Sequence, residues 1–380
     1  MKKILLVTER RADYSRFKEV LNEINKKKDL KYILVVTGMH LEKTFGNTIN
    51  EIKKDGFNIS YKFKMFDQKY LKYDDLGGMS RALSKCFKHL TAILEKEKPD
   101  FILSGFDIAA NFSLTTIGAH MNIPIGHIQG GEVSGNIDES LRHAMSKFSH
   151  LHFVSNSDAK KRLIKMGEKN SSIYTVGCPS IDALLHSKKQ SNLYIKKKYN
   201  LDLDKKYILV IQHPVTSERK LIKRHIENIF LALKKFNLNV FFILPNNDYG
   251  AKTIVNKIKV SNMSYSSHLE LTDYKTLLQN CELILGNSSS GIHEAATFKK
   301  PVVNIGSRQQ GRLKGRNIID VGNNYKEISN GITKGLSKRF KKKIKNIINP
   351  YGSGGSSKKI VKIIKSLKFK KIKIQKINTY

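Results

Sequence analysis

The chain has 380 residues, of which 40% are hydrophobic and 27% are charged, as in ordinary globular proteins. A single hydrophobic core stops growing at roughly 250–300 residues, so we expect two domains. No run approaches the roughly 20 apolar residues of a membrane span, and the apolar run after the basic start is too short for a signal peptide. Three scattered cysteines show neither a metal-binding spacing nor a disulfide framework. We therefore expect a cytoplasmic protein with no membrane partner, no metal and no other cofactor.

The net charge of +37 at pH 7 raises the alternative of a nucleic-acid-binding protein. The lysines are scattered, however, and no basic block with interleaved aromatic residues occurs. Between Lys338 and Lys373 they alternate with Ile, Val and Leu, which is typical of an amphipathic helix on the body of a protein. We expect no nucleic-acid partner, and a positive field that attracts an anionic substrate.

The first half of the chain alternates short apolar runs with amphipathic stretches, the pattern of βαβ units around a parallel sheet. Helices are predicted at Ser15 to Lys27 and Gly78 to Lys96. Strands are predicted at Lys3 to Thr8, Tyr32 to Thr37, Phe101 to Ser104, Ile123 to Ile128, Leu151 to Val154 and Ile173 to Val176.

The second half repeats this pattern. Its predicted strands are Tyr207 to Gln212, Val240 to Leu244, Leu283 to Leu285, Pro301 to Asn304 and Ile318 to Val321, and its helices Leu221 to Phe236, Tyr274 to Gln279 and Gly291 to Phe298. We therefore expect an α/β fold of two Rossmann-like doubly wound domains, residues 1–185 and 186–350, facing a cleft. Residues 351–380 should form a helix and tail that pack back on the first domain. Ligands of such sheets bind beyond the carboxyl ends of the strands.

Two loops at predicted strand ends are candidate phosphate sites. Arg10 and Arg11 follow the first strand, although the alternative is a helix start capped by Asp13. The loop GNSSSGIHE, residues 286–294, brings backbone N–H groups and hydroxyls together before a helix. There Glu294 is placed to accept hydrogen bonds from ribose hydroxyls. We interpret the second loop as a nucleotide-phosphate site.

Three further polar residues end strands of the second half. His213 follows the strand Tyr207 to Gln212, where a ligand role and a plain turn role are equally plausible. Asn246 and Arg308 end other strands on the same edge, and Arg308 is suited to pair with a phosphate.

The densest cluster of chemically capable residues is HIQGGEVSGNIDESLRH, residues 127–143. A predicted strand ends there in two glycines, with four carboxylate or imidazole groups within a dozen residues. Carboxylates crowded in a cleft repel, so one of them should have a raised pKa and move protons near neutrality. For Asp138 and Arg142, which are spaced i, i+4, a surface ion pair is the alternative. We expect the reacting centre here.

Several segments taken together resemble one enzyme family. RADYS, VTGMH, HIQGGEVSGNIDESLRH, GCPS, QHPVT and GNSSSGIHEAATFKKPVVNIGSRQ occur in order from about Val7 to Val321. They resemble the hydrolysing UDP-N-acetylglucosamine 2-epimerases, which include the bacterial sialic-acid biosynthesis enzymes and the epimerase half of the animal bifunctional enzyme. The resemblance implies a GT-B-type fold, a homodimer or homotetramer, and conversion of UDP-N-acetylglucosamine and water to N-acetylmannosamine and UDP.

The resemblance also implies roles for individual residues. A base removes the C2 proton of the sugar while UDP leaves C1, and water then adds to the resulting glycal. The implied acid/base residues are Asp107 and Asp138, with His40, Glu132, Arg142 and His143 around the sugar. The implied nucleotide contacts are Arg11, His213, Asn246, Ser288, Ser289, Ser290, Glu294 and Arg308. For Asp107, which follows the strand FILSG, helix capping is an equal alternative.

Two departures from the family pattern concern the reacting centre. Many relatives read Gly-Asp-Arg where this chain has Phe106-Asp107-Ile108, and many have glutamate where it has Gln129. A glutamine cannot exchange a proton as a carboxylate does, so the glutamate role is vacant or filled by a neighbour such as Glu132. The departures suggest rearranged acid/base duties or a related substrate, such as a UDP- or GDP-linked 2,4-diacetamido-trideoxy sugar of the legionaminic acid route.

Three other functions compete with a 2-epimerase. A GT-B glycosyltransferase would share the nucleotide-binding edge, but the carboxylate and imidazole cluster disfavours it. A catalytically inactive nucleotide-sugar sensor is favoured by Gln129 and would bind UDP without turnover. An RNA-binding protein would show a steep dependence of binding on salt.

Overall fold

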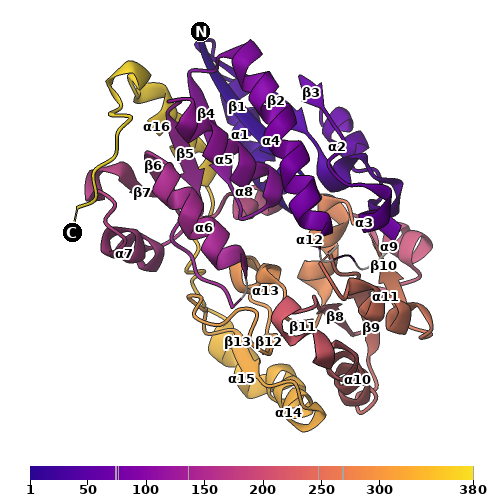
Figure 1. Ribbon diagram of the computed structural model, residues 1–380. Helices are drawn as coiled ribbons and strands as arrows, with labels where there is room; N and C mark the ends of the chain where they lie inside the picture. The colour runs from indigo at the N-terminus through magenta and orange to yellow at the C-terminus, as the bar shows by residue number, and fades with distance from the viewer. Residues whose placement is uncertain (73–74, 76, 136, 247, 268, 380) are drawn as a thin grey trace. The chain divides into compact units, whose positions relative to one another are not determined.

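The computed structural model describes residues 1–72, 75, 77–135, 137–246, 248–267 and 269–379; Asn136, which falls in the motif HIQGGEVSGNIDESLRH, lies outside this set. The chain forms two compact units (Figure 1). Unit 1 comprises Met1–Glu132, Ile137–Ala183 and Gly354–Tyr380, and unit 2 comprises Val133–Asn136 and Leu184–Ser353.

Unit 1 is built on a parallel seven-stranded sheet in the order β3-β2-β1-β4-β5-β6-β7. The strand order reverses between β1 and β4. Open α/β sheets bind their ligands at such a point, beyond the carboxyl ends of the strands. The strands are β1 (Lys2–Thr8), β2 (Leu30–Val36), β3 (Tyr61–Lys62), β4 (Phe101–Gly105), β5 (Ile125–Ile128), β6 (Leu151–Val154) and β7 (Ile173–Thr175).

Helices cover both faces of this sheet because its strands are apolar on both sides. Ile4 and Leu6 of β1 pack on one face with side chains of α1 and α16, whereas Leu5 and Val7 pack on the other face with α4 and α5. The α-helices of unit 1 are α1 (Arg11–Asn25), α2 (Ile49–Lys54), α3 (Gln68–Lys72), α4 (Gly78–Glu97), α5 (Ala109–His120), α6 (Ile137–Phe148), α7 (Ser157–Lys165), α8 (Pro179–His186), whose last residues belong to unit 2, and α16 (Ser356–Ser366).

Unit 2 repeats the architecture with a six-stranded parallel sheet in the order β10-β9-β8-β11-β12-β13. Its strands are β8 (Tyr207–Ile211), β9 (Asn239–Ile243), β10 (Ser264–Ser266), β11 (Leu283–Gly286), β12 (Val302–Ile305) and β13 (Ile318–Val321). Its α-helices are α9 (Asn192–Tyr199), α10 (Ile222–Leu233), α11 (Ala251–Lys259), α12 (Leu271–Asn280), α13 (Ser289–His293), α14 (Tyr325–Leu336) and α15 (Lys338–Ile344). Alternate residues of β8, such as Ile208 and Leu209, enter separate cores on the two faces.

The predicted fold class is confirmed: both sheets are doubly wound. The amphipathic helix expected between Lys338 and Lys373 is instead two helices, α15 and α16, because Gly352, Gly354 and Gly355 adopt positive φ angles between them. The helix predicted over Gly291 to Phe298 is α13 followed by a 3₁₀ turn. Within the described part of the chain, no helix has the length and apolar character needed to cross a membrane.

Candidate functional site

Four of the predicted residues of unit 1 form one hydrogen-bonded group beyond the ends of β4 and β5. Arg142 of α6 pairs through Nη2 with the carboxylate of Asp107, and its Nη1 donates to the backbone oxygen of Glu132 at 2.8 Å. Gln129 Nε2 donates to Glu132 Oε1 at 3.0 Å, and the hydroxyl of Ser155 donates to the same oxygen at 2.8 Å. The structure thus brings Asp107, Gln129, Glu132 and Arg142 together.

Backbone geometry explains why these side chains meet. Phe106 and Gln129 follow β4 and β5 with φ angles of 62° and 61°, a left-handed conformation that costs energy in residues other than glycine. The turn continues at Gly131, where φ is 76° and a Cβ would lie 2.5 Å from the backbone oxygen of Ala159. Such strain after two neighbouring strands is typical of functional sites.

Asp107 is not used to cap α5. The cap residue of that helix is Ile108, and the N–H of Ala110 in its first turn donates to Glu9 Oε2 at 3.0 Å. A carboxylate from the end of β1 therefore satisfies the helix end, so the capping interpretation of Asp107 is wrong.

Arg142 remains a cation although its side chain is only 3% exposed. Burial alone would lower its pKa, but the carboxylates of Asp107, Glu132 and Asp138 raise it. The alternative of a plain surface ion pair with Asp138 does not describe this guanidinium, which is buried and pairs with Asp107. A fixed positive charge here can stabilise negative charge that develops on a bound substrate.

The other predicted residues of unit 1 are Asp138 and His143 on α6, His40, and Arg11 on α1. Asp138 and His143 both belong to α6, and His143 Nε2 lies 3.7 Å from Glu139 Oε1; burial lowers the pKa of His143. His40 is buried and hydrogen-bonded by its two ring nitrogens to Thr8 and Thr48 at 3.0 and 2.6 Å.

Arg11 is the first residue of α1, and its Nη1 is buried with no hydrogen-bond partner among the described residues. Asp13 accepts the backbone N–H groups of Glu9 and Arg10 at 2.9 and 3.0 Å. The alternative of a helix start organised by Asp13 is therefore correct for that residue, and it leaves Arg11 available for an anion.

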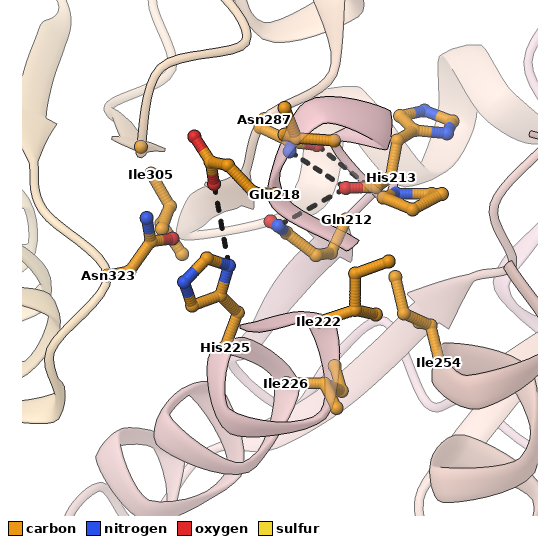
Figure 2. Close-up of a pocket in the computed structure, with 13 residues that line it drawn as sticks. Gln212, His213, Glu218, Ile222, His225, Ile226, Ile254, Asn287, Ile305 and Asn323 are labelled. Atoms are coloured by element: carbon orange, nitrogen blue, oxygen red, sulfur yellow. Dashed lines mark hydrogen bonds and ion pairs between the residues drawn. The ribbon is translucent and has the colours of Figure 1, made fainter. Parts of the chain in front are cut away.

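In unit 2, Asn287 fixes the position of His213. The backbone N–H of His213 donates to Asn287 Oδ1 at 2.7 Å, and Asn287 Nδ2 donates to the oxygen of His213 at 2.9 Å (Figure 2). Nδ1 of His213 accepts the N–H of Asn246 at 3.3 Å. A neutral ring with Nδ1 as acceptor carries its proton on Nε2, so His213 presents an N–H donor beyond the end of β8.

The serine loop forms a second group, joined to Glu294. Ser288 is the N-cap of α13 and accepts the N–H of Ser290, and Ser289 is the first residue of that helix. Ser290 Oγ donates to Glu294 Oε2 at 2.8 Å, and the hydroxyl of Tyr274 contacts Ser290 and donates to the same carboxylate oxygen at 2.9 Å. Tyr274 reaches the loop from α12 and holds the carboxylate in place.

Arg308 lies on the same side of unit 2. It is buried, its Nη1 donates to the backbone oxygen of Asn287 at 3.3 Å, and its Nε has no hydrogen-bond partner among the described residues. A small pocket lies beside His213 and is lined partly by Asn287, Glu218 and Asn323 (Figure 2). His213 and Arg308, both joined to Asn287 by hydrogen bonds, thus place N–H donors beyond the strand ends.

Sequence reasoning singled out neither Asn287 nor Tyr274. Asn287 was visible within GNSSSG, but its role depends on pairing with the backbone of residue 213. Tyr274 lies 16 residues before Ser290 in an ordinary amphipathic segment, so no local signal marks it. Among the described residues, no group of three or more His, Cys, Asp or Glu side chains could hold a metal ion.

Comparison with known proteins gives a consistent result along the whole chain. Residues 22–365 match the family model described as UDP-N-acetylglucosamine 2-epimerase. The chain is 36% identical to the UDP-N,N'-diacetylbacillosamine 2-epimerase (hydrolyzing) of Legionella pneumophila over 384 residues, covering 100% of both proteins. It is 31% identical to a UDP-N-acetylglucosamine 2-epimerase of Neisseria meningitidis serogroup B over 344 residues, covering 89% of this chain and 88% of that protein.

Solved structures show the same fold. The crystal structure of UDP-GlcNAc 2-epimerase from Neisseria meningitidis bound to UDP-GlcNAc superposes with a TM-score of 0.81 at 21% identity, covering 96% of this chain and 100% of that one. The S. aureus MnaA–UDP structure gives 0.80 at 22% identity, with 100% of both chains covered. The two doubly wound units are therefore a GT-B-type fold, and the family match together with the full-length relatives shows that the chain belongs to the UDP-N-acetylglucosamine 2-epimerase family.

Proposed function

We propose that this protein is a hydrolysing 2-epimerase that converts a UDP-linked 2-acetamido sugar and water to UDP and the free C2 epimer. The observation that carries the proposal is the hydrogen-bonded group of half-buried Asp107 with buried Arg142, Glu132 and Gln129 at the carboxyl edge of unit 1. It combines a carboxylate base with a fixed cation, the elements that removal of a proton from a sugar carbon requires. In keeping with this role, residues 1–185 supply the chemistry and residues 186–350 the nucleotide site.

The reaction has two steps. In the first, Asp107 or Asp138 takes the C2 proton, the C2–H electron pair forms a C1–C2 double bond, and the C1–oxygen bond breaks to release UDP. In the second, water adds to the glycal: its oxygen bonds to C1 and a proton is delivered to C2 from the opposite face. Arg142 stabilises the charge that develops in the first step, and His40, Glu132 and His143 surround the sugar.

Unit 2 holds the nucleotide in this proposal. The Nε2–H of His213, the guanidinium of Arg308 and the hydroxyls of Ser288 and Ser289 donate to the diphosphate. Ser290 holds Glu294 instead, and Arg11 of unit 1 is a further contact that the family resemblance implies. Glu294 accepts hydrogen bonds from the ribose hydroxyls, and Asn246 orients His213. The field of the +37 net charge favours binding of such an anion.

The identity of the sugar is the second part of the proposal. Our first candidate is UDP-N-acetylglucosamine, which would yield N-acetylmannosamine for sialic or other nonulosonic acids. The second is a UDP- or GDP-linked 2,4-diacetamido-trideoxy sugar. It is supported by the 36% identity to the Legionella pneumophila enzyme and by Gln129, whose Oε1 is buried with no hydrogen-bond partner among the described residues.

Proton NMR of the purified protein in D2O tests the proposal. With UDP-N-acetylglucosamine, we expect free UDP and N-acetylmannosamine with deuterium at C2, since the proton added in the second step comes from solvent. Release of UDP only from the diacetamido sugars would assign the second substrate. Binding of UDP without turnover of any of them would support a sensor and refute the proposal. Light scattering tests the expected homodimer or homotetramer, and fractionation of cells tests the expected cytoplasmic location.

Gln129→Glu separates a substrate role for residue 129 from an acid/base role. The new carboxylate would lie about 3 Å from that of Glu132, and two carboxylates so close cannot both ionise. If Gln129 selects the sugar, the ratio of kcat/KM between the two substrates changes. If the family glutamate role is merely vacant, the rate rises and the pH profile shifts for both substrates alike. An unchanged rate and substrate preference would count against any special role.

A further inference from the structure

The last residues of the chain lie along unit 1 beside the C-terminal end of α6. They follow the 3₁₀ turn Phe369–Lys371 and have no regular secondary structure. His150 Nε2 contacts the backbone oxygen of Ile374 at 3.1 Å, and the N–H of Thr379 donates to the oxygen of Gly167 at 2.9 Å. Lys147 Nζ, on α6 itself, donates to Asn378 Oδ1 at 2.5 Å. The tail, residues 372–379, is therefore attached at several points.

Lys376 makes the central attachment. Its ammonium donates to the backbone oxygens of Ser146, Lys147 and Ser149 at 3.1, 2.9 and 2.6 Å. These carbonyls belong to the last turn of α6 and the residue that follows, where oxygens lack partners within the helix. A cation at this end also interacts favourably with the helix dipole. Lys376 thus caps α6 from a segment more than 220 residues away.

A buried carboxylate keeps this ammonium in place. Glu168 Oε2 lies 2.7 Å from Lys376 Nζ and 3.0 Å from His152 Nε2, and Glu168 Oε1 lies 3.1 Å from Lys147 Nζ. Burial would raise the pKa of Glu168, but His152 and Lys376 lower it to about 2, so the carboxylate stays charged. A buried charge of this kind loses its partner only at a considerable cost.

Helix α6 connects the tail with the reacting centre. It spans residues 137–148 and carries Asp138, Arg142 and His143 in its first two turns. Ser146 Oγ donates to the backbone oxygen of Arg142 at 3.0 Å and contacts His127 Nδ1 at 3.1 Å. A shift of the last turn therefore moves the turn that carries Arg142, and misplacement by about 1 Å is enough to cost a large part of a catalytic rate.

We propose, on the basis of the function proposed above, that Lys376 is a positioning residue: the C-terminal tail holds α6 through Lys376 and so sets the position of Arg142 and Asp138. The tail makes no contribution of its own to the chemistry. It acts through the helix, so its loss should lower kcat and leave nucleotide binding by unit 2 unchanged.

The test compares Lys376→Met with Lys373→Met, which alters an exposed lysine of the same tail. In Lys376→Met we expect hydrogen exchange of the peptide spanning α6 to rise about tenfold and kcat to fall about ten- to a hundredfold. KM should stay within about twofold. The Lys373→Met variant should match the wild type in all three. Unchanged exchange of α6 in Lys376→Met would overturn the proposal, and so would faster exchange with an unchanged kcat.

Chemical rescue separates positioning from general damage to the fold. In Lys376→Cys, aminoethylation of the thiol rebuilds a side chain with an ammonium at nearly the length of lysine, while Cys86, Cys178 and Cys281 are buried. Recovery of both kcat and slow exchange after aminoethylation is expected, and loss without recovery contradicts the proposal. If the wild type releases no UDP, the function proposed above has failed, and the exchange of α6 alone then decides whether the tail holds the helix.

Discussion

At the scale of single residues, Asp107 is the group whose removal most directly tests the proposed chemistry. Asp107→Asn retains the shape of the side chain but removes its ability to accept a proton. We expect the rate of UDP release to fall by about 10²- to 10⁴-fold, the usual contribution of a general base. UDP affinity, measured by calorimetry, should stay unchanged because the proposed nucleotide contacts do not include Asp107.

Asp100→Asn is the control for Asp107→Asn. Asp100 lies just before β4, whereas Asp107 lies just after it. The carboxylate of Asp100 accepts the backbone N–H of Lys3 at 2.8 Å, so its role is structural. This variant should lose some stability and keep its rate per folded molecule. Full activity of Asp107→Asn would remove this residue from the proposed mechanism and leave Asp138 as the base.

Tyr274 supplies a complementary test in unit 2. Tyr274→Phe removes the hydroxyl that donates to Glu294 Oε2, so the carboxylate is less well oriented for the ribose. A hydrogen bond to a charged group contributes about 1.5–3 kcal/mol, which corresponds to a rise in the Kd for UDP of about 10- to 100-fold. We expect kcat at saturating substrate to change little. Tyr265→Phe, in the exposed edge strand β10, is the matched control, and an unchanged Kd in Tyr274→Phe would contradict the role given to Glu294.

At the scale of elements, the turn after β5 is held by contact between its backbone and α7. Gly131 has a φ of 76°, and a Cβ there would lie 2.5 Å from the oxygen of Ala159 and 2.8 Å from Leu163 Cγ. Gly56 has a similar φ of 80°, but nothing lies within 4 Å of the position of its Cβ. Gly56→Ala should therefore lower the free energy of unfolding only by the backbone strain, about 1–2 kcal/mol.

Gly131→Ala pays the same strain and must also displace the turn from α7. We expect it to lower the free energy of unfolding by at least about 1–3 kcal/mol more than Gly56→Ala, as overpacking does. Urea unfolding of the two variants beside the wild type measures the difference directly. Equal losses would mean that the turn relaxes away from α7 without cost, and the turn could not then fix Gln129 and Glu132 as described.

The same elements show which features the sequence predicts and which it cannot. β6 and β13 have the predicted bounds because apolar runs flanked by polar or turn residues mark them. β3 and β10 are two and three residues long, lie at sheet edges and carry polar side chains, so no periodicity reveals them. Their existence depends on pairing with β2 and β9, which the sequence does not display.

The site divides in the same way. Gln129, Glu132 and Arg142 were found from one contiguous motif, and the structure joins them. No residue next to Asp107 in the sequence marks it as part of the site, because its partner Arg142 lies 35 residues further along, on α6. The contacts of Lys376 with α6 span more than 220 residues and could not be inferred from any local pattern. Local motifs thus indicate the chemistry, whereas the residues that position it become visible only in the fold.

At the scale of the whole molecule, histidines buried in unit 1 contribute to the response to acid. Burial lowers the pKa of His127 to about 3 and also lowers those of His150 and His152. An unfolded chain binds protons at these rings from about pH 6.5 downwards, whereas the folded chain does not. The contribution of these neutral histidines to the free energy of unfolding should therefore be complete above pH 6.5 and should decrease as the pH drops towards 3.

His127→Gln tests how much of this acid sensitivity comes from one ring. For a pKa of 6.5 in the unfolded chain and about 3 in the folded one, His127 alone costs about 2 kcal/mol of stability at pH 5. The loss of unfolding free energy between pH 7.5 and pH 5, measured in urea, should be smaller by that amount in His127→Gln. His120→Gln, at an exposed position, should show the same loss as the wild type. If His127→Gln loses as much unfolding free energy between pH 7.5 and pH 5 as the wild type does, then His127 is already protonated in the folded state. The lowered pKa of this buried ring would then be wrong.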